Sequence, residues 1–263
     1  MTKKGFFKGL RENIKENKST FAVYVVLRVV VIAALIFSLL RRDFYSAFVC
    51  GLSLILFLVP AFIEKTFKLY LPSVLEIIIL LFIFAAQILG DLAYFYVRVP
   101  HWDTALHTIN GFLCAAVGFA LIDILNQNKN IKFQLSPIYV AIVAFCFSMT
   151  IGVLWEFFEF GSDMLLQTDM QKDTVLNYIS SVALDATKTN KTVLIENIKN
   201  FSINGELYDV GGYVDIGLID TMKDLIVNFF GAVVFSIIGF FYIKSRGKGK
   251  FAEKFIPKVR EEK

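Results

Sequence analysis

Cysteine, histidine and charged residues are scarce in this 263-residue chain, which has three cysteines, two histidines and 19% charged residues. Each cysteine lies inside an apolar run, where it behaves as a small hydrophobic residue, so we expect neither a disulfide framework nor a cysteine-based metal site. No serine or cysteine stands beside a base within the polar motifs of the chain. This absence argues against covalent catalysis by a side-chain nucleophile.

Apolar residues are abundant instead. They make up 56% of the chain, with 28 phenylalanines and a mean hydropathy of +0.63, against roughly 45–50% in soluble domains. Runs of about 20 apolar residues cross a bilayer as helices, and the chain has six: 20–40, 44–63, 71–90, 106–125, 137–160 and 221–243. The sequence therefore predicts an all-α multi-pass membrane protein, built as a bundle of six transmembrane helices with a small extracytoplasmic β-containing insert between helices 5 and 6.

Lysine and arginine are distributed unevenly between the two sides of this topology. Four segments on one side carry 18 of them, whereas the two short connections on the other side carry three. By the positive-inside rule, both termini are predicted to face the cytoplasm. The net charge of +4 then reflects membrane orientation, and we expect a lipid bilayer but no nucleic acid as partner. The oligomeric state is not specified by the sequence.

This orientation divides the chain into a basic amphipathic cytoplasmic segment (1–19), helices 1 to 5 (20–160), an extracytoplasmic insert (161–220), helix 6 (221–243) and a basic cytoplasmic tail (244–263). The first apolar run is too long for a cleaved signal peptide. Phe251, Phe255 and Ile256 in the basic tail resemble one face of an amphipathic helix on anionic lipid. Plain topology signals explain the basic residues of both tails equally well.

The insert differs from the rest of the chain in being rich in Asp, Asn, Thr and Lys. Its segments TVLIENI and FSINGELYDV suggest strands, and Asn204-Gly205 is a strong type I′ hairpin signal. We expect a small β cap over the outer helix ends. A flexible loop is the alternative, because isolated hairpins are marginally stable in water.

Polar side chains recur at helical spacing in the fourth, fifth and sixth spans. At 100° per residue, each set keeps to one face of its helix, and the topology places all three sets at the outer membrane face. The sets are Asp103, His107 and Asn110; Glu156, Glu159 and Asp163; and Asp220, Asp224 and Asn228. Gly231 follows the third set on the same side and would allow close approach of another helix. The three stripes predict one shared polar site.

Charged groups near hydrocarbon are costly, at about 2.5–3.5 kcal/mol each at the bilayer centre, and neighbouring carboxylates repel one another. Positive charge would offset both effects, and it could come from protons, Lys223, Arg98, His107, a cationic ligand or a metal ion. Carboxylates with imidazole favour a divalent cation and suit Zn²⁺, Mn²⁺, Mg²⁺ or Ca²⁺. The candidate ligands are Asp103, His107, Glu156, Glu159, Asp220 and Asp224. Asn110, Asn228 and Asp163 are candidates for polar support.

Each residue also has a structural alternative. His107 could simply bond Asp103 one turn earlier, Glu159 and Asp163 could be solvated at a helix terminus, and Asp220 could cap the sixth helix. Asn228 is harder to explain as a surface residue, because it lies about two turns inside the span, where an amide requires a partner.

Two charged residues lie apart from the stripes. Arg28 in the first span and Glu76 in the third are both predicted in the inner half of the membrane. Because intramembrane charges tend to pair or to mark pathways, they could form a structural ion pair across the bundle or line an ion route.

The ordered motifs W-D-x3-H-x3-G, W-E-F-x-E and D-T-x2-D-x3-N-x2-G-A resemble the YjdF-like bacterial inner-membrane proteins, a family without an established activity. They are also distantly similar to VanZ-like proteins, a family associated with glycopeptide resistance at the cell surface. The resemblance spans roughly residues 75–240 and implies a bacterial cytoplasmic-membrane protein. It matches the polar positions Asp103, His107, Glu156, Glu159, Asp220, Asp224 and Asn228, and nothing in 164–215.

Three functions fit these features. The first is a metal-dependent enzyme acting on a lipid or cell-envelope intermediate, with His107, Glu156 and Glu159 as catalytic candidates. The second is a transporter or cation-binding protein that uses the same cluster. The third is an accessory protein whose polar network only specifies packing.

Overall fold

The computed structural model describes residues 18–66, 69–127, 135–245 and 252–259. Most of the predicted amphipathic segment 1–19, and Phe251, lie outside the described residues. The chain packs as two compact units. Unit 1 comprises Met1–Gly152 and Val227–Lys263, and unit 2 comprises Val153–Ile226.

Within the described residues, six helical segments are long and apolar enough to cross a membrane, as the sequence predicts. They are α2 (Lys18–Leu40), α3 with α4 (Phe44–Leu56 and Val59–Thr66), α5 with η1 (Ser73–Phe84 and Ala85–Leu92), α7 (Trp102–Gln127), α8 (Pro137–Leu166) and α9 (Leu218–Lys244). A short helix, α6 (Phe95–Arg98), precedes α7. The chain is a mostly helical multi-pass membrane protein.

Two of the spans are irregular. The second is interrupted at Phe57 and Leu58, just before Pro60, which has no N–H to donate and fits only the first turn of the new helix α4. The third continues from α5 into η1, a π-helix of eight residues. Such wider turns are rare in proteins, and nothing in the apolar pattern of this run predicts one.

Several helices are longer than the apolar runs that predicted them, α8 and α9 among them. α8 continues to Leu166, where Gln167 adopts a left-handed φ of 56° and ends the helix. α9 begins at Leu218, after Gly217, and Asp215 Oδ2 accepts a hydrogen bond from Ile219 N at 3.0 Å. The cap at this helix start is therefore Asp215, and the alternative role of Asp220 as the N-cap is wrong.

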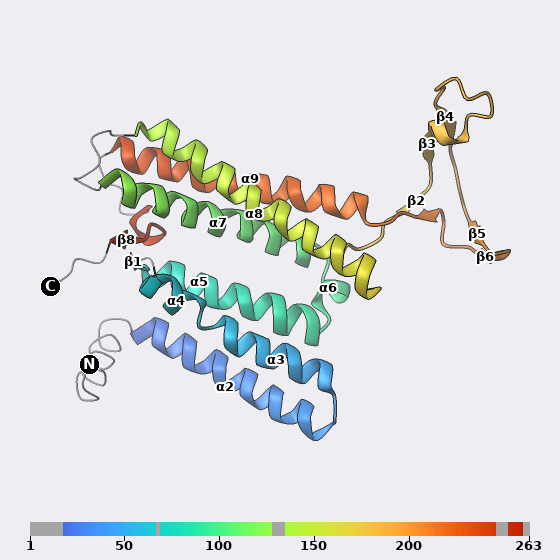
Figure 1. Ribbon diagram of the computed structural model, residues 1–263. Helices are drawn as coiled ribbons and strands as arrows, with labels where there is room; N and C mark the ends of the chain where they lie inside the picture. The colour runs from blue at the N-terminus through green and yellow to red at the C-terminus, as the bar shows by residue number, and fades with distance from the viewer. Residues whose placement is uncertain (1–17, 67–68, 128–134, 246–251, 260–263) are drawn as a thin grey trace. The chain divides into compact units, whose positions relative to one another are not determined.

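Unit 1 contains two hydrophobic cores. One joins α2, α3, α5 and η1 around Val31, Cys50 and Leu80, and Figure 1 shows α2, α3 and α5 side by side. The other joins α5, α7 and the parts of α8 and α9 that belong to this unit, around Phe119 and Phe235. Apolar side chains also cover the outside of the helices, as a bilayer requires.

The C-terminal segment folds back onto unit 1. Strand β8 (Lys258–Val259) pairs antiparallel with β1 (Leu69–Tyr70). Ile256 is buried in the second core, and the ring of Phe255 lies 5.4 Å from that of Phe112, centroid to centroid. The expectation that Phe255 and Ile256 lie on lipid is therefore wrong, because these side chains face the protein interior.

α7 and α9 approach each other closely through glycine. A Cβ atom on Gly111 would overlap the carbonyl oxygen of Asn228, and one on Gly231 would overlap the carbonyl oxygen of Thr108. The predicted close approach at Gly231 is confirmed. α7 is also the helix with the most protein around it: half of its apolar window is buried, against a third or less in the other spans.

Unit 2 contains the insert, which forms three separate two-stranded pairs. They are β2 with β7 (Val175–Leu176 and Tyr213–Val214), β3 with β4 (Ile179–Ser181 and Val193–Ile195) and β5 with β6 (Phe201–Ile203 and Glu206–Tyr208). The predicted hairpin is confirmed: Asn204 and Gly205 have φ of 52° and 88°, the positive values that a type I′ turn needs. The pairing of β2 with β7 has no sequence signal of its own.

The close approach of α7 and α9 generates a stability prediction. Gly111→Ala should lower the free energy of unfolding by about 1–3 kcal/mol, because the added methyl group meets backbone that cannot easily move. Gly51→Ala in α3 is the matched control, since nothing lies within 4 Å of its Cβ position. It should be neutral or stabilising by about 0.5–1 kcal/mol. Unfolding in detergent micelles measures both; equal effects would contradict the close approach.

Candidate functional site

The first turns of α7 place Asp103 and His107 on one face. The Nε2 atom of His107 lies 3.7 Å from Oδ1 of Asp103, which is ion-pair distance but longer than a hydrogen bond. His107 is buried, whereas Asp103 is half-buried. The structure therefore brings together the first two members of the predicted stripe, within unit 1.

Asn228 of α9 is the centre of a hydrogen-bonded network in unit 1. Asn110 Nδ2 donates to Asn228 Oδ1 at 3.3 Å, and Asn228 Nδ2 donates to Met149 Sδ at 3.6 Å. Cys114 Sγ adds a contact of 3.5 Å to Asn110 Oδ1. The predicted need of Asn228 for a partner is confirmed, since this residue is only 1% exposed.

Glycine gives Asn228 its space on both sides. Besides the overlap at Gly111, a Cβ on Gly152 of α8 would lie 2.7 Å from Asn228 Nδ2. On the neighbouring turn of α8, Ser148 Oγ donates to the Gly111 carbonyl at 2.7 Å. Asn228 is thus the point where α7, α8 and α9 meet inside unit 1.

Two acidic residues of α8, both in unit 2, are well buried. Glu156 is 4% exposed and Glu159 7% exposed, and Trp155 Nε1 donates to Glu159 Oε1 at 2.8 Å. The alternative that Glu159 is solvated at a helix terminus is therefore wrong. Trp155 is a hydrogen-bond partner that the sequence did not single out, although tryptophan four residues before glutamate has the right helical spacing.

The acidic residues of α9 in unit 2 differ from each other. Asp224 is 3% exposed. Asp220, in the first turn, accepts a hydrogen bond from Lys172 N to its Oδ2 atom at 2.7 Å. Asp220 therefore binds the backbone of the insert, while Asp224 is buried one turn further along the helix.

Asp163 also binds the insert. Its carboxylate accepts hydrogen bonds from Met170 N, Gln171 N and Thr168 Oγ1 at 2.7–2.8 Å, and Gln171 Nε2 donates to Thr221 Oγ1 of α9. Together with Thr174 N, which donates to Asp215, these bonds tie residues 170–174 (the 170–174 segment) to both helices. Neither Asp163 nor Asp220 is a simple solvated acid.

Asp173 lies within the 170–174 segment. Partial burial, with the nearby Asp169 and Asp215 carboxylates, raises the pKa of Asp173. The acids at this start of the insert therefore repel one another as well as anchoring the backbone.

Arg28 and Glu76 lie in unit 1, away from Asn228. The guanidinium carbon of Arg28 is 4.3 Å from the Tyr24 ring centroid, and its Nε atom is buried without a hydrogen-bond partner. The structural ion pair between Arg28 and Glu76 stays a prediction.

Comparison with known families finds that residues 23–245, most of the chain, match the family described as predicted membrane protein, DUF2238. The chain belongs to this family. The description agrees with the six apolar helices, and it carries neither of the two family names that the motifs resemble. No curated protein and no solved structure matches the chain.

The network around Asn228 leads to a prediction by double-mutant cycle. Asn110→Ala and Asn228→Ala should each destabilise the protein, and together less than the sum of their single effects. The expected coupling is about 0.6 kcal/mol and at most about 1.7 kcal/mol, the range for hydrogen bonds between membrane helices. Unfolding titrations in mixed micelles give the four free energies; strict additivity would show that the two amides do not interact.

The role of Asp163 is testable by limited proteolysis. Asp163→Ala removes the acceptor for two backbone N–H groups, so residues 167–172 should become cleavable at lower protease concentrations than in the parent protein. Asp209→Ala is the control, because it lies in the same insert beyond β6. Unchanged cleavage of Asp163→Ala would mean that its hydrogen bonds do not hold this part of the insert.

Proposed function

We propose that this chain binds one divalent metal ion and uses it to act on a lipid or cell-envelope intermediate. The proposed ligands are Asp103, His107, Glu156, Glu159 and Asp224, with Asn110 and Asn228 as polar support. Asp163 and Asp220 stand outside this set, because backbone N–H groups of the insert bind their carboxylates.

The position of Asn228 carries the proposal. On α7 it faces Gly111, and His107 is one turn before Gly111. On α8 it faces Gly152, and Glu156 is one turn after Gly152. On α9 itself, Asp224 is one turn before Asn228. Because α8 and α9 are each unbroken helices, side chains one turn apart stay on one face.

The direction of the helices supports the same conclusion. Successive spans alternate in direction, so moving back along α7 and α9 and forward along α8 leads toward the same membrane face. His107, Glu156 and Asp224 are thus each displaced from Asn228 toward that face. A common site requires no departure from helical geometry.

The donor set suits metal chemistry. Carboxylates together with one imidazole match Zn²⁺, Mn²⁺, Mg²⁺ or Ca²⁺. When bound, such an ion polarises a phosphoryl or carbonyl oxygen and makes a bound water more acidic. Glu156 or Glu159 would accept the proton of the attacking water. Asp103 would bind the same ion as His107, since its Oδ1 atom lies 3.7 Å from His107 Nε2.

The location we propose is the bacterial cytoplasmic membrane, with both termini inside and the metal site toward the outer face. The excess of lysine and arginine in the segments assigned to the cytoplasm supports this orientation. The resemblance to YjdF-like and VanZ-like proteins supports the bacterial envelope as its setting. A lipid or envelope intermediate could then reach the site from the outer leaflet.

Transport is the second candidate, and Arg28 is the observation that favours it. This residue lies ten positions into the 23-residue helix α2, about 15 Å from its start at 1.5 Å per residue. Tyr24, whose ring lies against Arg28, and Glu76 of α5 provide further polar groups in unit 1. Intramembrane charges of this kind often mark ion pathways.

Metal titration tests the proposed function. Full-length protein stripped of metal should bind one equivalent of Zn²⁺ or Mn²⁺ in isothermal titration calorimetry. His107→Ala and Glu156→Gln should weaken binding at least as much as the loss of an outer-shell partner does, about 10–100-fold. Asp163→Asn is the control and should bind like the parent protein.

Two outcomes would contradict the proposal. If the parent protein binds none of the four metals, or if His107→Ala binds as tightly as the control, these residues hold no metal. Uptake of the same ion by liposomes that contain the protein, with loss of uptake in Arg28→Gln, would favour transport instead.

A further inference from the structure

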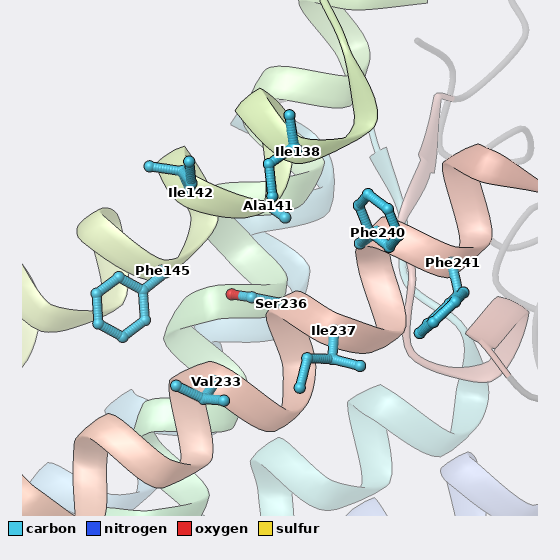
Figure 2. Close-up of a pocket in the computed structure, with 9 residues that line it drawn as sticks. All are labelled: Ile138, Ala141, Ile142, Phe145, Val233, Ser236, Ile237, Phe240 and Phe241. Carbon is cyan, nitrogen blue, oxygen red and sulfur yellow. The ribbon is translucent and has the colours of Figure 1, made fainter.

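An apolar groove opens between α8 and α9, within unit 1. Its cavity volume is about 310 Å³, at the lower end of the roughly 300–1,000 Å³ of small-molecule sites. Figure 2 shows that α8 contributes Ile138, Ala141, Ile142 and Phe145, and α9 contributes Val233, Ser236, Ile237, Phe240 and Phe241. The Phe145 and Phe229 rings, 5.3 Å apart from centroid to centroid, bring the two helices together at the end of the groove that is farther from Phe240.

Ser236 is the single polar side chain of the lining. It is 8% exposed, and its Oγ atom has no hydrogen-bond partner. In Figure 2 this oxygen points from α9 into the space between the two helices. A buried hydroxyl without an acceptor is unfavourable, especially in hydrocarbon, where no water can replace the missing partner. The groove therefore presents an unused donor to whatever fills it.

A positive charge lies at the mouth of the groove. Lys244 ends α9, and its Nζ atom is 5.6 Å from the ring centroid of Phe240, a lining residue. The sequence continues with Arg246, Lys248 and Lys250. Clusters of basic residues directly after a membrane helix attract anionic lipid headgroups. The mouth of the groove is thus complementary to a negatively charged occupant.

The position of the groove relative to the membrane surface suits a lipid. α9 has 27 residues, about 40 Å at 1.5 Å per residue, so its end extends beyond a hydrocarbon core of about 30 Å. Lys244 therefore reaches the headgroup region. Its charge lies near Phe240, one helical turn or about 6 Å from Ser236. From the interface inward, the groove offers a cation, a hydroxyl donor and apolar walls, in that order.

We propose that this groove binds one acyl chain of an anionic phospholipid. The phosphate lies at Lys244, an ester carbonyl accepts a hydrogen bond from Ser236, and the chain lies against the apolar walls. The order of groups in a phospholipid, phosphate then ester then hydrocarbon, matches the order along the groove. This site is independent of the proposed metal site, since it shares no residue with it.

Native mass spectrometry of the full-length protein tests the proposal, with equal amounts of phosphatidylglycerol and phosphatidylcholine as probes. The parent protein should retain phosphatidylglycerol preferentially. Lys244→Gln should weaken its retention about fivefold, which corresponds to about 1 kcal/mol per basic residue. Ser236→Ala should weaken it about threefold, the usual effect of one hydrogen bond within a membrane protein.

Ile142→Trp places a larger side chain in the groove and should abolish retention of phosphatidylglycerol. Val234→Trp is the control, because Val234 lies on α9 between the lining residues Val233 and Ser236 but is exposed and does not line the groove. It should retain lipid like the parent protein. Thermal unfolding of all variants in detergent identifies any loss of retention that comes from misfolding.

Three outcomes would overturn the proposal. The first is equal retention of the two lipids by the parent protein. The second is loss of the preference in Lys244→Gln but not in Ile142→Trp or Ser236→Ala, which would place the lipid on the basic segment alone. The third is a dimer that Ile142→Trp dissociates, which would make a second copy of the chain the occupant.

Discussion

Burial of one amide in a water-free interior is the constraint on which the packing of α7, α8 and α9 depends. Water cannot satisfy the polar atoms of Asn228 in a bilayer, so protein groups must do so. Asn110 and Met149 supply those partners, and they do so at distances that only close helices allow. Gly111 and Gly152 are small where Asn228 needs room. Apolar packing alone would permit small shifts along these helices, whereas directional hydrogen bonds fix the relative positions of their turns.

Two ionisable residues within the spans, His107 and Arg28, are supported by different surroundings. His107 is carried by α7, the helix with the most protein around it, and its neighbour Asp103 is within ion-pair distance. Arg28 is carried by α2, the span with the least burial, and its guanidinium lies over the aromatic ring of Tyr24. Cation–π contacts are worth less than a good ion pair unless they are well desolvated. His107 and Arg28 are thus held by different kinds of contact, a carboxylate at ion-pair distance in one case and an aromatic ring in the other.

The sequence predicted what depends on composition and helical period. The six spans follow from the length that hydrocarbon requires, the Asn204-Gly205 turn follows from positive φ, and the depth of Asn228 follows from counting turns. The sequence did not predict what depends on particular backbone partners. α8 continues beyond residue 160, the end of its predicted apolar run, and a backbone N–H group of the insert binds Asp163 near its end. Asp215, which lies before the sixth apolar run, caps the start of α9. No sequence pattern predicted that Met149 and Cys114 belong to the polar network, because sulfur-containing side chains count as hydrophobic residues in such patterns.

The hydrogen bonds that attach the insert to the helices determine which parts of the insert can vary in sequence and length. Hydrogen bonds from the 170–174 segment reach Asp163 at the end of α8 and Asp215, Asp220 and Thr221 at the start of α9. The two helix ends are therefore joined by a few residues at the root of the insert, and the strand pairs lie beyond this junction. Lengthening a loop costs little entropy, about 0.6 kcal/mol for each doubling. The strand pairs can thus vary in length and sequence, or accept a foreign segment at the Asn204-Gly205 turn, while the helices beneath keep their connection.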